Sequence, residues 1–259
     1  MFCHSSASGA MPIALDGHDV PDRLRQECKR LVFGFLHGTG RSRSMNTNLK
    51  IILTAVDDAL ADAWERHCGD VANVVVHRGS IFDVSCDALV SPANSFGFMD
   101  GGIDMIYSRR FGWGVQERLQ EMIRTRHHGE LLVGAAEIVE TGDEAFPYII
   151  AAPTMRVPHV LGYTVNPYLA ARAVLLIIKH GVMSEGQFAG QPVSSLVQSV
   201  AFPGLGTGVG RVGPNMCAHQ VRRAIDDVLG EHHHFPTSWD DATRRHKQMY
   251  MDFLGEIEA

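Results

Sequence analysis

Short apolar runs recur along the chain, separated by polar residues, glycines and prolines. Such runs are typical of β-strands that are buried in a sheet. They predict strands over residues 50–55, 73–77, 88–91, 132–141, 147–152 and 197–202. A turn at Gly142 separates 132–141 from 147–152, which predicts that these two strands run antiparallel.

Between the strands, apolar residues recur at intervals of three and four, which places them on one face of a helix. They predict helices over 112–128, 168–180 and 214–229. Asp57 or Asp58 is expected to cap a further helix. Its apolar face would carry Leu60, Ala63, Trp64 and His67. Strands that alternate with helices predict an α/β fold, a three-layer α/β/α sandwich with a mixed β-sheet.

The two ends of the chain differ from this pattern. Residues 1–44 mix Ser, Gly, His and Pro, and we expect a poorly ordered N-terminal extension apart from a helix at about 21–36. The compact domain is predicted over 45–230. Residues 231–259 are predicted to form a C-terminal helix that is packed on the domain. Its anchoring side chains would be Trp239, Tyr250 and Phe253.

Composition indicates which partners and which cellular compartment suit this protein. The 259 residues carry a net charge of −6, which argues against broad electrostatic capture of nucleic acid. No apolar run is long enough to span a membrane, and we expect no membrane partner. The five cysteines are scattered and odd in number, so we expect reduced thiols and a cytoplasmic protein.

Residues 201–214 contain the densest glycine pattern of the chain. Gly204, Gly206, Gly208 and Gly210 stand at every second position, after a predicted strand and before a predicted helix. Such a loop can wrap a phosphate, because it lacks Cβ atoms and its N–H groups converge beside a helix N-terminus. The spacing matches neither Walker A nor the dinucleotide motif Gly-x-Gly-x-x-Gly. A tight structural turn is the alternative.

A second group of polar residues follows the predicted strand 88–91. Asn94 and Asp104 fall in the same loop region, together with Gly101 and Gly102. The carboxyl ends of parallel strands carry ligand-binding groups in α/β folds. An amide, a carboxylate and two glycine loops suit a nucleotide diphosphate that is linked to a sugar. As alternatives, Asn94 would form an Asx turn and Asp104 would cap a helix.

The order of these segments resembles the macro domain family, whose members bind ADP-ribose. The matching stretches are Gly79-Ser-Ile81, Asp87-Ala-Leu-Val-Ser-Pro-Ala-Asn94, Asp100-Gly-Gly-Ile-Asp104 and Leu205-Gly-Thr-Gly-Val209. Together they span about residues 48–230. The resemblance implies a macro domain fold and an ADP-ribose site.

Carried over to this chain, the resemblance implies that Asn94 contacts the distal ribose. It also implies that Asp104 is the acidic residue that hydrolytic members use near that ribose. Asn94 and Asp104 are therefore the candidate catalytic residues. The ligand-binding residues would be Ser80, Ile81, Gly101, Gly102, Ile103, Gly204, Gly206, Thr207, Gly208, Val209 and Gly210.

The chain departs from the family pattern at four positions. Ser80 replaces the aspartate that receives the adenine amino group, with Asp83 as a nearby substitute. Ser91 replaces the first asparagine of Asn-Ala-Ala-Asn, and Asp100 replaces the first loop glycine. Gly210 stands where an aromatic ring often covers the distal ribose. The replacement ring would come from Phe96, Phe98, Tyr107 or Phe111.

The remaining candidates for chemistry have simpler interpretations. The histidines at 127–128 and 232–234 lack paired metal ligands and are expected on the solvated surface, so we predict no metal and no cofactor. Cys86 and Cys217 are expected as buried thiols. Arg156 would reach a phosphate or pair with a surface acid. Trp113 and Phe111 are expected to serve packing.

Three functions are compatible with these observations. The first is a macro-type domain that binds ADP-ribose, an ADP-ribosylated substrate or a related nucleotide diphosphate sugar. Such a domain would hydrolyse ADP-ribosyl or O-acetyl-ADP-ribose bonds without a metal. In that case Asp104 would activate a water that attacks the anomeric carbon of the distal ribose or an acyl group on it. The second is a reader that binds ADP-ribose without turnover. The third is a scaffold that uses 1–44 and 231–259 as contact surfaces.

Overall fold

A computed structural model describes residues 49–230 and 235–251 of the chain. The expectations for 1–44, for the histidines 232–234 and for Phe253 lie outside the described residues. The division into an extension, a domain and a C-terminal helix therefore stays a prediction. In the part that the model describes, no helix is both long and apolar enough to cross a membrane.

Six strands form one mixed sheet in the order β2-β1-β6-β3-β5-β4. The strands are β1 (Lys50–Ala55), β2 (Val74–Arg78), β3 (Ala88–Ser91), β4 (Glu137–Glu140), β5 (Tyr148–Ala151) and β6 (Ser199–Phe202). Only the pairing of β4 with β5 is antiparallel. The sequence prediction of a mixed sheet with that antiparallel pair is confirmed.

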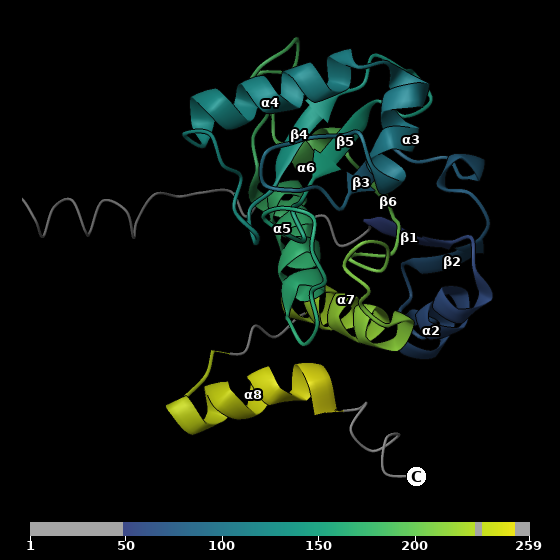
Figure 1. The fold of residues 1–259 in the computed structure, drawn as a ribbon, viewed down its shortest axis with the longest axis vertical. Helices are drawn as coiled ribbons and strands as arrows, with labels where there is room; N and C mark the ends of the chain where they lie inside the picture. Colours follow the sequence, from purple (N-terminus) through teal and green to yellow (C-terminus); the bar gives the residue numbers. More distant parts are fainter. Residues whose placement is uncertain (1–48, 231–234, 252–259) are drawn as a thin grey trace, which may run out of the picture. The chain divides into compact units, whose positions relative to one another are not determined.

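Helices cover both faces of the sheet (Figure 1). On one face lie α2 (Asp58–Cys68), α5 (Asn166–His180), the short α6 (Val193–Leu196) and α7 (Pro214–Leu229). On the other lie α3 (Gly102–Phe111) and α4 (Gly114–Arg126). The final described helix is α8 (Trp239–Met251). This is the predicted three-layer α/β/α sandwich.

The alternation of side chains along each strand creates two separate cores. In β1, Ile51 and Leu53 point into the core that α2, α5 and α7 share, whereas Ile52 points into the core beneath α3 and α4. In β3, Val90 and Leu89 divide in the same way, and both are fully buried. Apolar residues at successive strand positions are therefore explained by burial on both faces.

Helix boundaries follow the capping chemistry that the sequence predicts. The Asp57 side chain accepts a hydrogen bond from the Leu60 N–H at 2.9 Å and so caps α2. Pro214 begins α7, where its missing N–H costs no helical hydrogen bond, and Gly230 follows the last residue. The predicted bounds of α7 are confirmed.

Three local predictions are wrong. The helix predicted over 112–128 is present as α4 with shorter bounds, but α3 occupies part of the region that is predicted as the loop of Asn94 and Asp104. The strand predicted over 132–141 is shorter and consists of β4 alone. The first half of that range forms a turn, in which the Ala135 N–H donates a hydrogen bond to the Leu132 carbonyl. Trp239 does not anchor α8, since 87% of its surface is exposed. Met249 is buried there instead, and the Gln248 carbonyl lies 2.9 Å from His219 Nε2 of α7.

Candidate functional site

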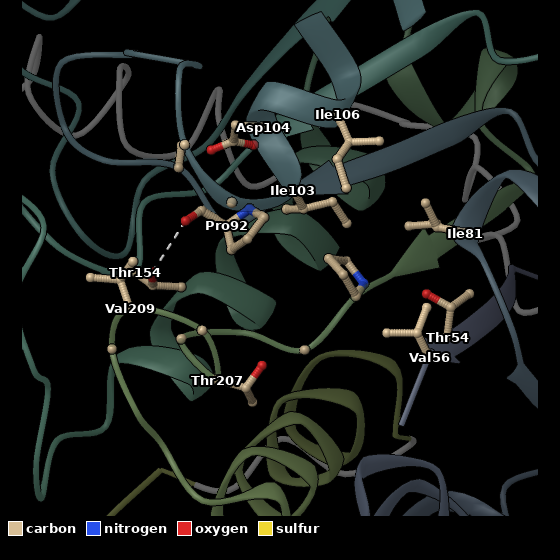
Figure 2. Close-up of a pocket in the computed structure, with 18 of the residues that line it drawn as sticks. Thr54, Val56, Ile81, Pro92, Ile103, Asp104, Ile106, Thr154, Thr207 and Val209 are labelled. Atoms are coloured by element: carbon tan, nitrogen blue, oxygen red, sulfur yellow. Dashed lines mark hydrogen bonds between the residues drawn. The ribbon is translucent and has the colours of Figure 1, made fainter. Parts of the chain in front are cut away.

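A cavity of about 380 Å³ opens at the carboxyl ends of the parallel strands. The chain segments that leave β1, β2, β3, β5 and β6 all contribute to its wall (Figure 2). Every ligand-binding and catalytic residue predicted from the sequence lines this one cavity. Asn94 and Thr207, which are far apart in the chain, are thereby brought to the same site. What each residue does there stays a prediction.

The glycine loop after β6 leaves a run of backbone N–H groups without protein partners. In the described part of the chain, the N–H groups of residues 206–210 donate no hydrogen bond. The carbonyls of Gly206, Gly208 and Gly210 accept bonds from the N–H groups of Val212, Arg211 and Leu161. The loop is thus fixed through its carbonyls, and its amides are left for a ligand. Successive N–H groups of this kind form an anion-binding concavity.

Packing and backbone conformation explain why two of these positions are glycine, and neither explains the third. A Cβ on Gly210 would lie 2.5 Å from the Gly206 carbonyl oxygen, which no backbone tolerates. Gly206 itself has φ +71°, a conformation that favours glycine. A Cβ on Gly208 would meet no atom within 4 Å. Gly208 is therefore the position where a side chain would enter free space at the cavity wall.

A second set of free amides comes from the start of α3. Gly101 occupies the N-cap position, and Gly102 has φ +55°. The N–H groups of residues 102–104 precede the first helical hydrogen bond, which Met105 donates to the Gly101 carbonyl. They lie at the positive end of the helix dipole, where an anion is stabilised. Asp100 lines the cavity beside them and adds a negative side chain.

Asp104 lies in the first turn of α3 and is buried, with 7% of its surface exposed. Its Oδ1 accepts a hydrogen bond from the Ser91 hydroxyl at 2.6 Å. Burial raises the pKa of Asp104 to about 7, and the hydrogen bond from Ser91 acts in the opposite direction. Both protonation states are therefore populated near neutral pH, as a general acid or base requires. Gly101, and not Asp104, holds the N-cap position.

Asn94 stabilises its own loop. Its Oδ1 accepts bonds from the N–H groups of Phe96 (3.1 Å) and Phe98 (3.3 Å), and its Nδ2 donates to the Phe98 carbonyl at 2.8 Å. These are the contacts of the Asx-turn alternative. One amide hydrogen of Asn94 is still free to donate toward the cavity, so its contact with a ribose stays a prediction.

Ser80 and Ile81 belong to the part of the cavity wall that follows β2. Ser80 caps a short 3₁₀ helix (Ile81–Asp83): its Oγ accepts from the Phe82 N–H, and its own N–H donates to Asp83 Oδ2 at 3.0 Å. Asp83 is thus part of the turn and does not line the cavity, so the expected substitute for the missing aspartate is absent. Figure 2 shows Ile81 on the same side as Thr54 and Val56.

The structure selects one of the four aromatic residues expected to cover the ligand. Of these four, Phe98 alone lines the cavity, and it is half exposed. Tyr107 is fully buried and donates to the Val90 carbonyl. Phe111 packs on other aromatic rings, and Phe96 lies against the Arg156 guanidinium.

The other candidate groups have structural roles. Arg156 forms an ion pair with Glu130 at 2.6 Å, which is the surface alternative. Burial raises the pKa of the Cys86 and Cys217 thiols to about 12, so neither is a thiolate nucleophile. His127 is not simply solvated, because its Nε2 lies 2.7 Å from the buried Glu137 carboxylate. Trp113 is half exposed, whereas packing was expected.

Within 49–230 and 235–251, no three His, Cys, Asp or Glu side chains gather as a metal ion would need.

Sequence reasoning missed several cavity residues. Thr54, Val56 and Asp57 come from the end of β1, and Thr154 and Met155 follow β5. The Thr154 hydroxyl donates to the Pro92 carbonyl at 3.2 Å and so joins two of the loops (Figure 2). The strand topology could have indicated these residues, since every parallel strand of such a sheet ends at the ligand-binding edge.

Comparison with known proteins identifies relatives. The chain is 30% identical to an uncharacterized protein of Aquifex aeolicus (strain VF5) over 153 residues, which cover 59% of this chain and 81% of that protein. It is 29% identical to an uncharacterized protein of Aeropyrum pernix over 158 residues, which cover 61% of this chain and 73% of that protein.

Solved structures with a similar fold include the macrodomain of Mycobacterium tuberculosis DarG. That match has 20% identity and a TM-score of 0.47, and covers 60% of this chain and 90% of that one. The Oceanobacillus iheyensis macrodomain with ADP matches at 21% identity and a TM-score of 0.46, and the match covers 69% of this chain and 89% of that one. The family model of the macro domain matches residues 90–221, half of the chain. This chain belongs to the macro domain family.

Proposed function

We propose that the cavity binds ADP-ribose or a related nucleotide diphosphate sugar. One observation carries the proposal: two runs of unpartnered backbone N–H groups, at 102–104 and 206–210, belong to the wall of the same cavity. Such groups bind phosphate oxygens without a positively charged side chain. This suits a protein whose net charge is −6. Membership of the macro domain family supports the same ligand class.

The other parts of the wall suit the other parts of such a ligand. Val56 and Ile81 lie on one side of the cavity and offer apolar surface for a base next to Ser80. Asn94 lies in the loop after β3 and Asp104 in the first turn of α3, and Phe98 lines the same cavity as cover for a sugar. The diphosphate would bridge the two groups of amides. The three described cysteines are free and buried, which supports a reducing compartment such as the cytoplasm.

We further propose that Asp104 makes the site hydrolytic. The ionised carboxylate would accept a proton from a water whose oxygen bonds to the anomeric carbon of the distal ribose. The bond from that carbon to the oxygen of an attached carboxylate breaks, and the freed carboxylate leaves with the electron pair. The amides of the glycine loop hold the diphosphate in place during the reaction. The pKa of Asp104, raised by burial to about 7, supports this role.

Binding without turnover is the second candidate. The observation that favours it is Asn94, whose amide oxygen and nitrogen are both engaged within its own loop. With its oxygen engaged and one amide hydrogen left for a ribose, Asn94 would bind the ligand without orienting it for attack.

The ligand class is tested by thermal shift and calorimetry with ADP-ribose, AMP, NAD, a UDP-sugar and pyrophosphate. ADP-ribose should raise the melting temperature more than AMP or pyrophosphate, because only the whole ligand reaches both groups of amides and the base end. The comparison with the UDP-sugar measures the base preference that Ser80 sets. A panel in which no nucleotide stabilises the protein would contradict the proposal.

The glycine loop is tested by Gly208→Val, with Gly213→Val as the matched control. Both positions have open space around a Cβ, but only Gly208 lines the cavity. We expect Gly208→Val to weaken ADP-ribose binding by about 10- to 100-fold, since hydrogen bonds to charged oxygens contribute about 1.5–3 kcal/mol each. Gly213→Val should bind like the wild type. Equal affinity of the two variants would remove the loop from the binding site.

The hydrolytic role of Asp104 is tested by Asp104→Asn on ADP-ribosylated protein and on O-acetyl-ADP-ribose. The variant should lose about 10²- to 10⁴-fold in turnover, because it cannot accept a proton, and should retain ADP-ribose binding. Asp62→Asn, an exposed carboxylate of α2, is the control. Turnover that survives in Asp104→Asn would exclude this mechanism. Binding with no turnover in the wild type would establish the non-catalytic reader.

The same variant tests the burial of Asp104 without a substrate. The folded pKa of about 7 lies above the ordinary value of 3.8, so the wild type loses stability as the pH rises from about 4 to about 7. Asp104→Asn lacks this loss. Urea unfolding should show a difference of about 1 kcal/mol at pH 4.5, and at pH 8 the variant should be more stable by about 4 kcal/mol. Parallel pH dependences of the two proteins would show that Asp104 is not desolvated.

A further inference from the structure

We propose that Ser91 is a positioning residue for Asp104: its hydroxyl holds one carboxylate oxygen and leaves the other for water or ligand. The effect of Ser91 on catalysis rests on the proposed hydrolytic function. The contact between Ser91 and Asp104 does not depend on that function. The family pattern has an asparagine at the position of this serine.

Ser91 is held rigidly. It is the last residue of β3, its side chain is fully buried, and it pairs in register with Ala151 of β5. Its carbonyl accepts a hydrogen bond from the Ala152 N–H at 3.0 Å, which continues the ladder past the strand end. The hydroxyl therefore projects from a fixed point of the sheet edge.

The contact with Asp104 engages one oxygen only. The Ser91 Oγ lies 2.6 Å from Oδ1 of Asp104, a length typical of a hydroxyl that donates to a carboxylate. Among the residues that the structure describes, no donor contacts Oδ2. Asp104 lines the cavity, so Oδ2 is the oxygen that a bound water would meet. Ser91 thus decides which face of the carboxylate does the chemistry.

A serine suits a carboxyl group that changes its protonation state. The hydroxyl donates to the ionised carboxylate and, after rotating its hydrogen, accepts from the protonated acid. Asp104 can therefore gain and lose a proton without leaving its place. An alanine would leave a buried carboxylate without a donor, which disfavours the ionised form.

Few other ionisable groups surround Asp104. Tyr107, one turn along α3, has its hydroxyl on the Val90 carbonyl, and burial with the nearby Asp104 raises its pKa well above 10. Asp57 and Asp100 line the same cavity from the loops after β1 and before α3. Residues 203–210 of the glycine loop carry no ionisable side chain. Arg156, after β5, is paired with Glu130. Ser91 is thus the group that stabilises the ionised form of Asp104 by direct contact.

The experiment compares Ser91→Ala with Ser108→Ala. Ser108 is an equally buried serine on α3 whose hydroxyl donates to the Met99 carbonyl and does not touch Asp104. The carboxyl carbon of Asp104 is titrated by NMR in the wild type and both variants, and the pH dependence of hydrolysis is measured on the same proteins. Ser91→Cys, which keeps a weak donor of similar size, is the additional variant.

In Ser91→Ala we expect the Asp104 titration and the acidic limb of the pH–rate profile to move upward together by about one to two pH units. Ser91→Cys should lie between, and Ser108→Ala should titrate like the wild type. An unchanged titration in folded Ser91→Ala, or an equal shift in Ser108→Ala, overturns the proposal. A shifted titration in a protein that hydrolyses nothing at any pH would instead retain Ser91 and reject the hydrolytic function.

Discussion

The structure depends on one constraint at the carboxyl edge of its sheet: backbone N–H groups that the chain does not satisfy internally. Most backbone N–H groups of a folded chain are paired within secondary structure, so several unpaired ones at one place are unusual. Here two runs of them, at 102–104 and 206–210, belong to the wall of one cavity. An anion at that position would supply the missing acceptors. The proposed ligand follows from this unmet hydrogen bonding more than from any single side chain.

The packing of the helices keeps these amides exposed. Thr207 and Leu60 of α2 both lie close to Gly204, so a side chain there would have to displace them, and Cys217 of α7 accepts the Leu205 N–H through its sulfur. Both helices are anchored in the same core as β1 and β6. The start of the glycine loop is therefore held against the same core that carries the sheet.

The local elements of the fold and most of the cavity residues could be predicted from the sequence. The period of the apolar residues and the Pro214 and Gly230 boundaries predict α7, and the glycine spacing points to the loop after β6. The helix α3 could not be predicted in this way, because Gly101 and Gly102 read as loop and the helix starts on a left-handed glycine. Thr54 and Asp57 were missed because only the strand order, in which β1 is a neighbour of β6, brings them to the site. The Asx turn of Asn94 is one of the alternatives that the sequence predicts, whereas the hydrogen bond from Ser91 to Asp104 depends on side-chain orientation, which no spacing encodes.

The most direct test of the central claim is an amide ¹⁵N–¹H NMR titration of the full chain with ADP-ribose. If one diphosphate bridges the two groups of amides, the signals of residues 102–104 and 206–210 should shift along the same saturation curve. Pyrophosphate alone should move both groups less and at higher concentration. Shifts confined to one group, or two groups that saturate at different ligand concentrations, would contradict a single shared site.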